Sequence, residues 1–203
     1  MSTETRLRPS EHGDLPWRIN EVTHDFDLID AWVLPATGTL DEFGDLCRIF
    51  GNLDPADDRG SSVSRTLFAA RAWLGGRMGW DDPEVVNKLA IPGCEEFSVR
   101  DRLPVELTAT VHRTSGDSNF RGVFEVDDEA AFELSNSLVH AILHLGWARQ
   151  PDGHYRGQMG VYVKYRGKIG APYMAVIAPF RHHIVYPALL RRIGAAWESR
   201  SGE

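Results

Sequence analysis

The sequence predicts an α+β fold, in which an antiparallel sheet packs against a long C-terminal helix and shorter helices lie near the N-terminal half. Three observations predict it. Apolar residues recur at helical spacing in the first hundred residues, apolar and polar residues alternate within residues 104–165, and residues 171–197 return to helical spacing. The sheet is therefore expected between two helical parts.

Length and composition restrict the class of protein. With 203 residues, of which 42% are hydrophobic and 25% charged, the chain matches an ordinary globular protein. We expect a flexible N-terminal segment over residues 1–14 and a single domain over residues 15–203. No apolar stretch is long enough for a membrane helix, and no secretory signal is legible. A cytoplasmic protein without stable membrane insertion is therefore expected.

Charge is distributed unevenly along the chain. The net charge of −7 argues against nucleic-acid binding, which needs a basic surface. Residues 154–203 nevertheless carry a net charge of +6, which leaves −13 for the preceding part. We expect this basic segment to pack against the acidic part of its own chain, in a monomer or homodimer, and an acidic partner protein is the alternative.

The first predicted elements are a strand and a helix. Residues 26–34 alternate in part and are expected to form a short strand that stops at Pro35. Thr39 and Glu42 have the spacing of a capping box, and the apolar face of the helix that follows places Cys47 in the core. Further helices are expected over residues 63–78 and between residue 82 and the stop at residues 91–93.

The middle of the chain changes to a period of two. Residues 104–114 show the clearest alternation and are expected to form a half-buried strand. Turn residues 127–128 and 151–153 bracket a long segment, and its neighbours on both sides alternate, so an antiparallel meander is the simplest topology. The other expected strands are residues 120–126, residues 131–148 and residues 159–165.

The C-terminal helix is expected to be long and interrupted. Val185, Leu189 and Ile193 fall four residues apart and begin an apolar stripe that continues to Trp197. Residues 179 and 187 are prolines, which remove backbone donors and clash with preceding carbonyls, so the helix should kink or break there.

A polar cluster interrupts the long middle segment. Asn136, His140 and His144 are spaced by four and share one face in either a helix or a strand. On a helix the two histidines would lie roughly 6 Å apart and could share a metal ion, whereas on a strand they would lie about 13 Å apart. The bracketing turns favour the strand, which argues against a metal site. The absence of phosphate-loop, dinucleotide, hydrolase-triad and zinc-protease motifs likewise predicts no cofactor.

These residues suggest a ligand pocket. On a strand they share a face with four apolar residues, and a mostly apolar wall with a few hydrogen-bonding groups is typical of ligand sites. The alternative is that their polar atoms are satisfied internally. In the tail, only one of the neighbouring residues His182 and His183 can face the sheet, and Arg181 can pair with a buried carboxylate, an anionic ligand or solvent. The candidate ligand-binding residues are Asn136, His140, His144, Arg181 and His182, and the candidate catalytic residues are His140 and His144.

Three segments carry a resemblance to a known family: LVHAILHLGW (residues 138–147), MGVYVK (159–164) and APFRHHIVYP (178–187). From residue 26 to residue 197 the chain resembles the domain-of-unknown-function family 2867 (DUF2867). The resemblance implies the helix-grip fold of the START and polyketide-cyclase-like (SRPBCC) superfamily, with an apolar cavity between sheet and helix. Relatives fused to short-chain reductase modules imply small-molecule metabolism. The resemblance implies no catalytic residues.

Two functions follow as hypotheses. The first is binding of a small apolar or aromatic molecule between the sheet and the C-terminal helix, with Asn136, His140 and His144 orienting it. The second is an enzyme of the cyclase, aldol-condensation or dehydration type, in which His140 or His144 serves as general acid or base. The sequence does not identify the ligand.

Overall fold

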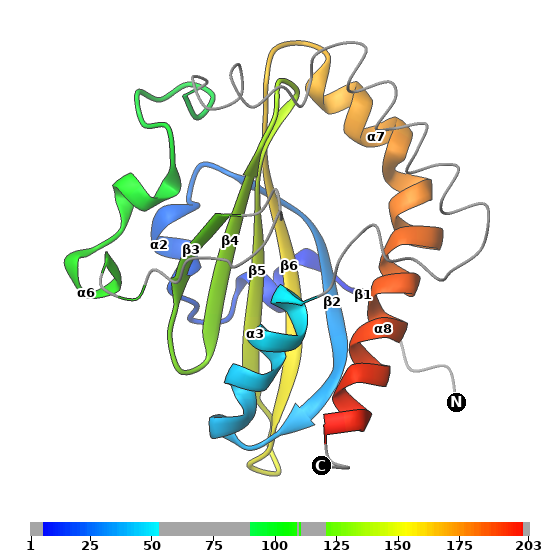
Figure 1. Ribbon diagram of the computed structural model, residues 1–203. Helices are drawn as coiled ribbons and strands as arrows, with labels where there is room; N and C mark the ends of the chain where they lie inside the picture. The colour runs from blue at the N-terminus through cyan, green and yellow to red at the C-terminus, as the bar shows by residue number, and fades with distance from the viewer. Residues whose placement is uncertain (1–5, 53–89, 109, 111–120, 201–203) are drawn as a thin grey trace.

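The computed structural model describes residues 6–52, 90–108, 110 and 121–200, which form one antiparallel sheet with helices on both faces (Figure 1). The six described strands lie in the order β1-β2-β6-β5-β4-β3. The predicted α+β class is confirmed, and the arrangement is consistent with a helix grip. The strands are β1 (Arg6–Leu7), β2 (Asp27–Gly38), β3 (Arg121–Glu125), β4 (Glu129–Ser135), β5 (Val139–Arg149) and β6 (Tyr155–Tyr165).

The C-terminal helix runs for 30 residues along one face of the sheet (Figure 1). It consists of α7 (Gly170–Phe180), a π-helical turn η3 (Arg181–Val185) and α8 (Tyr186–Ser199). The expected interruption takes the form of this π-turn, which lies between Pro179 and Pro187 and widens the helix where backbone donors are missing.

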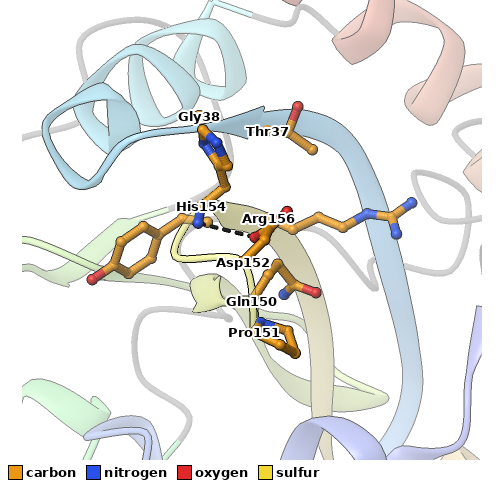
Figure 2. Close-up of a pocket in the computed structure, with 8 residues that line it drawn as sticks. Thr37, Gly38, Gln150, Pro151, Asp152, His154 and Arg156 are labelled. Carbon is orange, nitrogen blue, oxygen red and sulfur yellow. Dashed lines mark hydrogen bonds between the residues drawn. The ribbon is translucent and has the colours of Figure 1, made fainter.

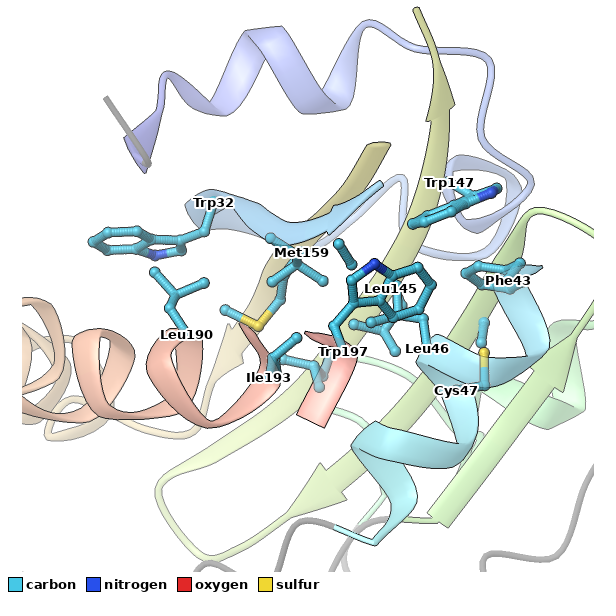
Figure 3. Close-up of a cluster of buried hydrophobic side chains, with 14 of the residues drawn as sticks. Trp32, Phe43, Leu46, Cys47, Leu145, Trp147, Met159, Leu190, Ile193 and Trp197 are labelled. Carbon is cyan, nitrogen blue, oxygen red and sulfur yellow. The ribbon is translucent and has the colours of Figure 1, made fainter. Parts of the chain in front are cut away.

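Helix α3 (Phe43–Gly51) packs on the same face and confirms the helix predicted after Thr39. The Glu42 carboxylate accepts a hydrogen bond from the Thr39 backbone N–H at 2.6 Å, as in a capping box, and the short 3-10 turn η1 (Leu40–Glu42) leads into α3. Cys47 is buried, as predicted. Figure 3 shows the shared core, in which Trp32 of β2 and Trp197 of α8 lie between the sheet and these helices.

The opposite face is covered by short N-terminal elements that the sequence did not reveal. These are α1 (Pro9–Gly13), α2 (Ile19–Val22) and the 3-10 turn η2 (Val99–Arg102). Within residues 1–14, which we expected to be flexible, β1 pairs with β2 and His12 of α1 is fully buried. A second apolar cluster, which includes Trp17, Ile19 and Ile142, lies beneath this cover.

Strand β2 extends beyond the predicted stop at Pro35 and ends at Gly38. The register with β6 shifts between Val33 and Thr37, and β1 pairs only with Ala31 and Trp32. A proline is tolerated at such an irregular, edge-like position because no ladder hydrogen bond requires its nitrogen. The predicted boundary was therefore wrong.

The long segment 131–148 is two strands, not one. Asn136 turns the chain between β4 and β5, where its side-chain oxygen accepts hydrogen bonds from the backbone N–H groups of Leu138 and Val139, each at 2.9 Å. His144 consequently pairs with Ala131, whereas Phe132 pairs with Leu143. Since cross-strand partners share a face and adjacent residues do not, Phe132 lies on the face opposite the histidines. The single continuous wall that we predicted does not form.

The clearest predicted strand, residues 104–114, is also corrected. Residues Val105–Thr108 form a helical turn, α6, in which Val105 is 85% exposed and only Leu107 is buried. Two alternating apolar residues do not separate a strand from one helical turn, and Pro104 supplies the acceptor that closes the turn. Residue 109, residues 111–114 and the two helices expected within residues 63–91 lie wholly or mainly outside the described residues.

The basic C-terminal part pairs with acidic residues from the N-terminal part. Arg181 lies 3.2 Å from Asp30, Arg200 lies 3.5 Å from Asp45, and Lys164 pairs with Asp25. These contacts agree with packing of the basic segment against its own chain.

Candidate functional site

His140 and His144 lie on the face of the sheet that α1, α2 and η2 cover, away from the C-terminal helix. The strand register carries both onto this face together with Ile142, and both side chains are fully buried. We expected them to face the C-terminal helix. They do not, because on β5 the residues that face the C-terminal helix are Leu143 and Leu145, and His140, Ile142 and His144 alternate with them and face the other way.

His144 belongs to a buried chain of four side chains. Its Nδ1 lies 2.9 Å from Nε2 of His12, whose Nδ1 lies 2.8 Å from Oε1 of Gln158. Its Nε2 lies 3.1 Å from Oε2 of Glu129. An amide oxygen only accepts, so Nδ1 of His12 donates to Gln158 and Nε2 of a neutral His12 is an acceptor. Nδ1 of His144 therefore donates to Nε2 of His12, and Nε2 of a neutral His144 is an acceptor in its turn. Glu129 completes the chain as a carboxylic acid that donates to His144.

The pKa shifts agree with a neutral chain. Burial lowers the pKa of His12 from 6.5 to about 3, with a further contribution from His144. Burial likewise lowers the pKa of His144 to about 3, and it raises the pKa of Glu129. Neither histidine is therefore placed to exchange a proton near pH 7. Glu129 also accepts the backbone N–H groups of Arg18 and Ile19, so it anchors the start of α2.

His140 forms a second carboxylate pair, with Glu133. Its Nε2 lies 3.3 Å from Oε2 of Glu133, which also accepts the Val99 backbone N–H at 3.1 Å. The other oxygen accepts the Ser98 hydroxyl at 2.6 Å and lies 3.3 Å from Arg121. Burial opposes ionisation, but these partners outweigh it and lower the pKa of Glu133. This charged carboxylate ties η2 to the sheet.

The three middle-segment candidates therefore have structural partners. Asn136 closes a turn, and His140 and His144 hold the cover of the N-terminal face. The structure does not bring them together with Arg181 and His182, which lie on the other face of the sheet.

Arg181 and His182 meet at Asp30, a residue of β2 that the sequence analysis overlooked. The Asp30 carboxylate is 1% exposed, and Nε2 of His182 lies 2.6 Å from its Oδ1. Its Oδ2 accepts the Tyr186 hydroxyl at 2.9 Å and lies 3.2 Å from Nη2 of Arg181. Arg6 lies 3.7 Å from Oδ1. We call Asp30, Arg6, Arg181, His182 and Tyr186 the Asp30 cluster.

The π-turn explains how the helix supplies three of these groups. Arg181 and Tyr186 stand five residues apart, and the i to i+5 period of η3 directs both, with His182, toward β2. His183 is exposed. The prediction that only one of the two neighbouring histidines faces the sheet is confirmed, and Arg181 pairs with a buried carboxylate, one of its three predicted alternatives. The available sequence signal for Asp30 was a lone acid within the apolar run Ile29–Leu34.

The Asp30 cluster lies between two apolar regions beneath the C-terminal helix. On the side of α8, the ring of Trp32 lies 5.0 Å from that of Tyr186 and 6.2 Å from that of His182. On the side of α7, a separate cluster contains Val163 and Met174, and half-buried Tyr165 and Ile177 pack against it. Side chains of His182 and Arg181 remain 18% and 14% exposed, so the cluster is accessible from solvent.

Two surface hollows formed by described residues lie elsewhere. One, of about 700 Å³, lies between the end of β2 and the β5–β6 turn and is lined by Gln150, His154 and Arg156 among others (Figure 2). The other, of about 550 Å³, lies between Phe43 of α3 and the β3–β4 turn. Neither hollow is lined by a predicted site residue.

The described residues form neither a metal-binding cluster nor a membrane-spanning helix. Among them, no three His, Cys, Asp or Glu side chains are grouped so that they could hold a metal ion. No helix within the described ranges has the length and apolar character needed to cross a membrane.

Comparison with known families gives one match. Searches of the curated proteins and of the solved structures returned no similar protein. Residues 22–188 match the family described as a protein of unknown function, DUF2867. This range contains β2 to β6, the π-turn and four of the five members of the Asp30 cluster; Arg6 lies outside it. Since the match covers more than half of the chain, the protein belongs to the DUF2867 family.

Proposed function

We propose that this protein binds a small apolar or aromatic molecule between the sheet and the C-terminal helix, with the Asp30 cluster at the polar end of the site. The observation that carries the proposal is the position of this half-open charged cluster between two apolar regions, under a π-turn. Ligand sites combine apolar walls with a few fixed polar groups, and π-turns are frequent at functional sites.

The fold supports the same location. A sheet packed against a long C-terminal helix resembles the helix-grip arrangement of the START and polyketide-cyclase-like superfamily, in which the cavity lies between these two elements. Arg181 and His182, two of the predicted ligand-binding residues, contact Asp30 in that position. Asn136, His140 and His144 do not enter the proposal, because their polar contacts lie in a turn or beneath the N-terminal cover.

The proposal is tested by capture of a ligand. Purified full-length protein is incubated with cell extract, washed and examined by native mass spectrometry. We expect an added mass of a few hundred daltons on the wild-type chain, its reduction in Arg181→Met, and its retention in Arg191→Met, since Arg191 is exposed on α8. Equal retention by both variants would place the ligand away from the Asp30 cluster and refute the proposal.

A second candidate is an enzyme in which His182 is the general acid or base, in a cyclase, aldol-condensation or dehydration reaction. Its 2.6 Å contact with the buried Asp30 favours this role, because a carboxylate fixes the orientation of an imidazole ring. Once a ligand is known, His182→Gln discriminates the two functions. Loss of turnover with retained binding would support the enzyme, whereas wild-type turnover in this variant would exclude it.

A further inference from the structure

Both oxygens of the Asp30 carboxylate already have partners. Oδ1 contacts His182 at 2.6 Å and forms an ion pair with Arg6 at 3.7 Å, and Oδ2 accepts the Tyr186 hydroxyl and forms an ion pair with Arg181. These four groups surround the carboxylate.

Two buried donors beside Asp30 lack an acceptor. One is the indole N–H of Trp32, a residue that is 5% exposed and whose ring packs against His182 and Tyr186. The other is the Nε–H of Arg181, whose Nη2 contacts Asp30 and whose Nη1 contacts the Met174 sulfur. Neither has a hydrogen-bond partner in the part of the chain that the structure describes. A buried donor without a partner is unfavourable because it has lost its hydrogen bonds to water, so both atoms favour an added acceptor.

The net charge of the Asp30 cluster also favours an added acceptor. Two guanidinium groups, those of Arg6 and Arg181, surround one carboxylate, so the cluster is positive even when His182 is neutral. A cationic ligand would meet two like charges and an acid whose two oxygens already have partners. An anionic ligand group would meet two free donors and a positive field.

We infer that the ligand proposed above carries a carboxylate, which accepts hydrogen bonds from Nε1 of Trp32 and Nε of Arg181 while its apolar body lies along the C-terminal helix. This inference rests on the proposed function and specifies the ligand as an apolar organic acid. Two donors suit the two oxygens of a carboxylate. The apolar body is accommodated by the half-buried side chains around α7, among them Tyr165 and Ile177.

The experiment uses three probes with the same ten-carbon chain and different head groups: decanoate, 1-decanol and decylamine. Binding to the full-length protein is measured by isothermal titration calorimetry below the concentrations at which the probes form micelles. We expect decanoate to bind at least tenfold more tightly than decanol, and decylamine to bind most weakly. Two hydrogen bonds to an ionised carboxylate are sufficient for such a difference.

Variants then locate the head group. Trp32→Phe keeps an aromatic ring but removes the indole N–H. Arg181→Met removes the guanidinium but keeps an apolar chain. Each is expected to weaken decanoate about tenfold and to leave decanol unchanged, while Arg191→Met changes neither. Far-ultraviolet circular dichroism and melting temperature establish that each variant is folded.

The outcomes separate the two proposals. Equal affinity for decanoate and decanol would overturn the carboxylate inference and leave the small-molecule proposal standing. A preference for decanoate that survives both Trp32→Phe and Arg181→Met would also overturn the inference, because the head group would bind elsewhere. If none of the three probes binds, both proposals fail.

Discussion

The two faces of the sheet both bury carboxylates, but they use them differently. On the N-terminal face, Glu129 and Glu133 contact backbone N–H groups of the covering segments and the imidazoles of His144 and His140. These acids and both imidazoles are at most 3% exposed. On the helix face, Asp30 contacts side chains that are partly exposed. Buried polar atoms without a partner among the described residues occur on both faces, Nε1 of Trp17 and Nδ1 of His140 on one and Nε1 of Trp32 and Nε of Arg181 on the other, so the two faces differ in the exposure of the groups around the acids.

This difference separates architecture from a candidate site. Buried polar groups that have partners hold a fold together, and they specify which segments lie where. A buried acid whose partners are accessible from solvent is instead prepared for an additional group. The predicted histidines belong to the first kind, and Arg181 with His182 belongs to the second.

The largest expected effect is acid destabilisation through the N-terminal face. The pKa of His12 and that of His144 are near 3 in the folded state and near 6.5 when unfolded, so below pH 6.5 the unfolded chain binds more protons and stability falls. Each histidine contributes about 1.4 kcal/mol per pH unit, or roughly 5 kcal/mol for both at pH 4.5. The raised pKa of Glu129 acts in the opposite direction, because above pH 4.5 the folded chain keeps this proton while the unfolded chain releases it, so Glu129 offsets part of the loss as the pH falls toward 4.5.

Urea denaturation at pH 7.5, 6.5, 5.5 and 4.5 measures this loss. The exposed His183 provides a control, since His183→Gln should leave the slope against pH unchanged. A constant free energy of unfolding from pH 6.5 to 4.5 would contradict the neutral chain and indicate a charged pair of His144 with Glu129.

A second prediction distinguishes the two acids of this face. The carboxylate of Glu133 only accepts, and it contacts Ser98, Val99, His140 and Arg121. Glu133→Gln replaces it with an amide and should lower the free energy of unfolding by about 3 kcal/mol. Glu129→Gln should cost less, about 1 kcal/mol, because the amide can donate to His144 and accept from Arg18 and loses only the contact with the Ile19 backbone N–H. Urea denaturation at pH 7.5 compares them, with the exposed Asp127→Asn as control. Equal costs at Glu129 and Glu133 would show that both acids are charged.

Much of the fold was predictable because period and capping are local signals. The capping box before α3, the alternation in β3 and β6 and the stripe of the C-terminal helix each lie within about a dozen residues. The failures occurred where a local pattern was ambiguous. Two apolar residues near Val105 fit a strand or a turn, and Asn136 was interpreted as part of a strand when its side chain closes a turn.

The candidate site was less predictable because its contacts are distant in sequence. Asp30 lies 152 residues from His182 and 156 from Tyr186. Gln158 lies 146 residues from His12, and no periodicity links such positions. The spacing of His140 and His144 correctly placed them on one face, but the elements that cover this face reach it through contacts distant in sequence, such as that of His144 with His12.

A third prediction concerns the close approach of α1 to the sheet. A Cβ at Gly160 of β6 would lie 2.5 Å from Nε2 of His12, so Gly160→Ala should displace α1 and cost about 2 kcal/mol. Gly44→Ala, on the open side of α3, should instead stabilise by up to about 1 kcal/mol through helix propensity. Thermal unfolding of both variants measures the contrast. A neutral Gly160→Ala would mean that α1 is not fixed on this face.

The smallest expected effect on stability lies at the Asp30 cluster and completes the contrast between the faces. His182 is 18% exposed, and Asp30 keeps its contacts with Tyr186 and Arg181 when the imidazole of His182 is removed. His182→Gln should therefore change the free energy of unfolding by less than about 1 kcal/mol. His183→Gln is the matched control one residue away. If His182→Gln destabilised as strongly as Glu133→Gln, the Asp30 cluster would be architecture like the opposite face. A small cost in stability for His182→Gln, together with the weakened decanoate binding expected of Arg181→Met, would instead distinguish it as a site.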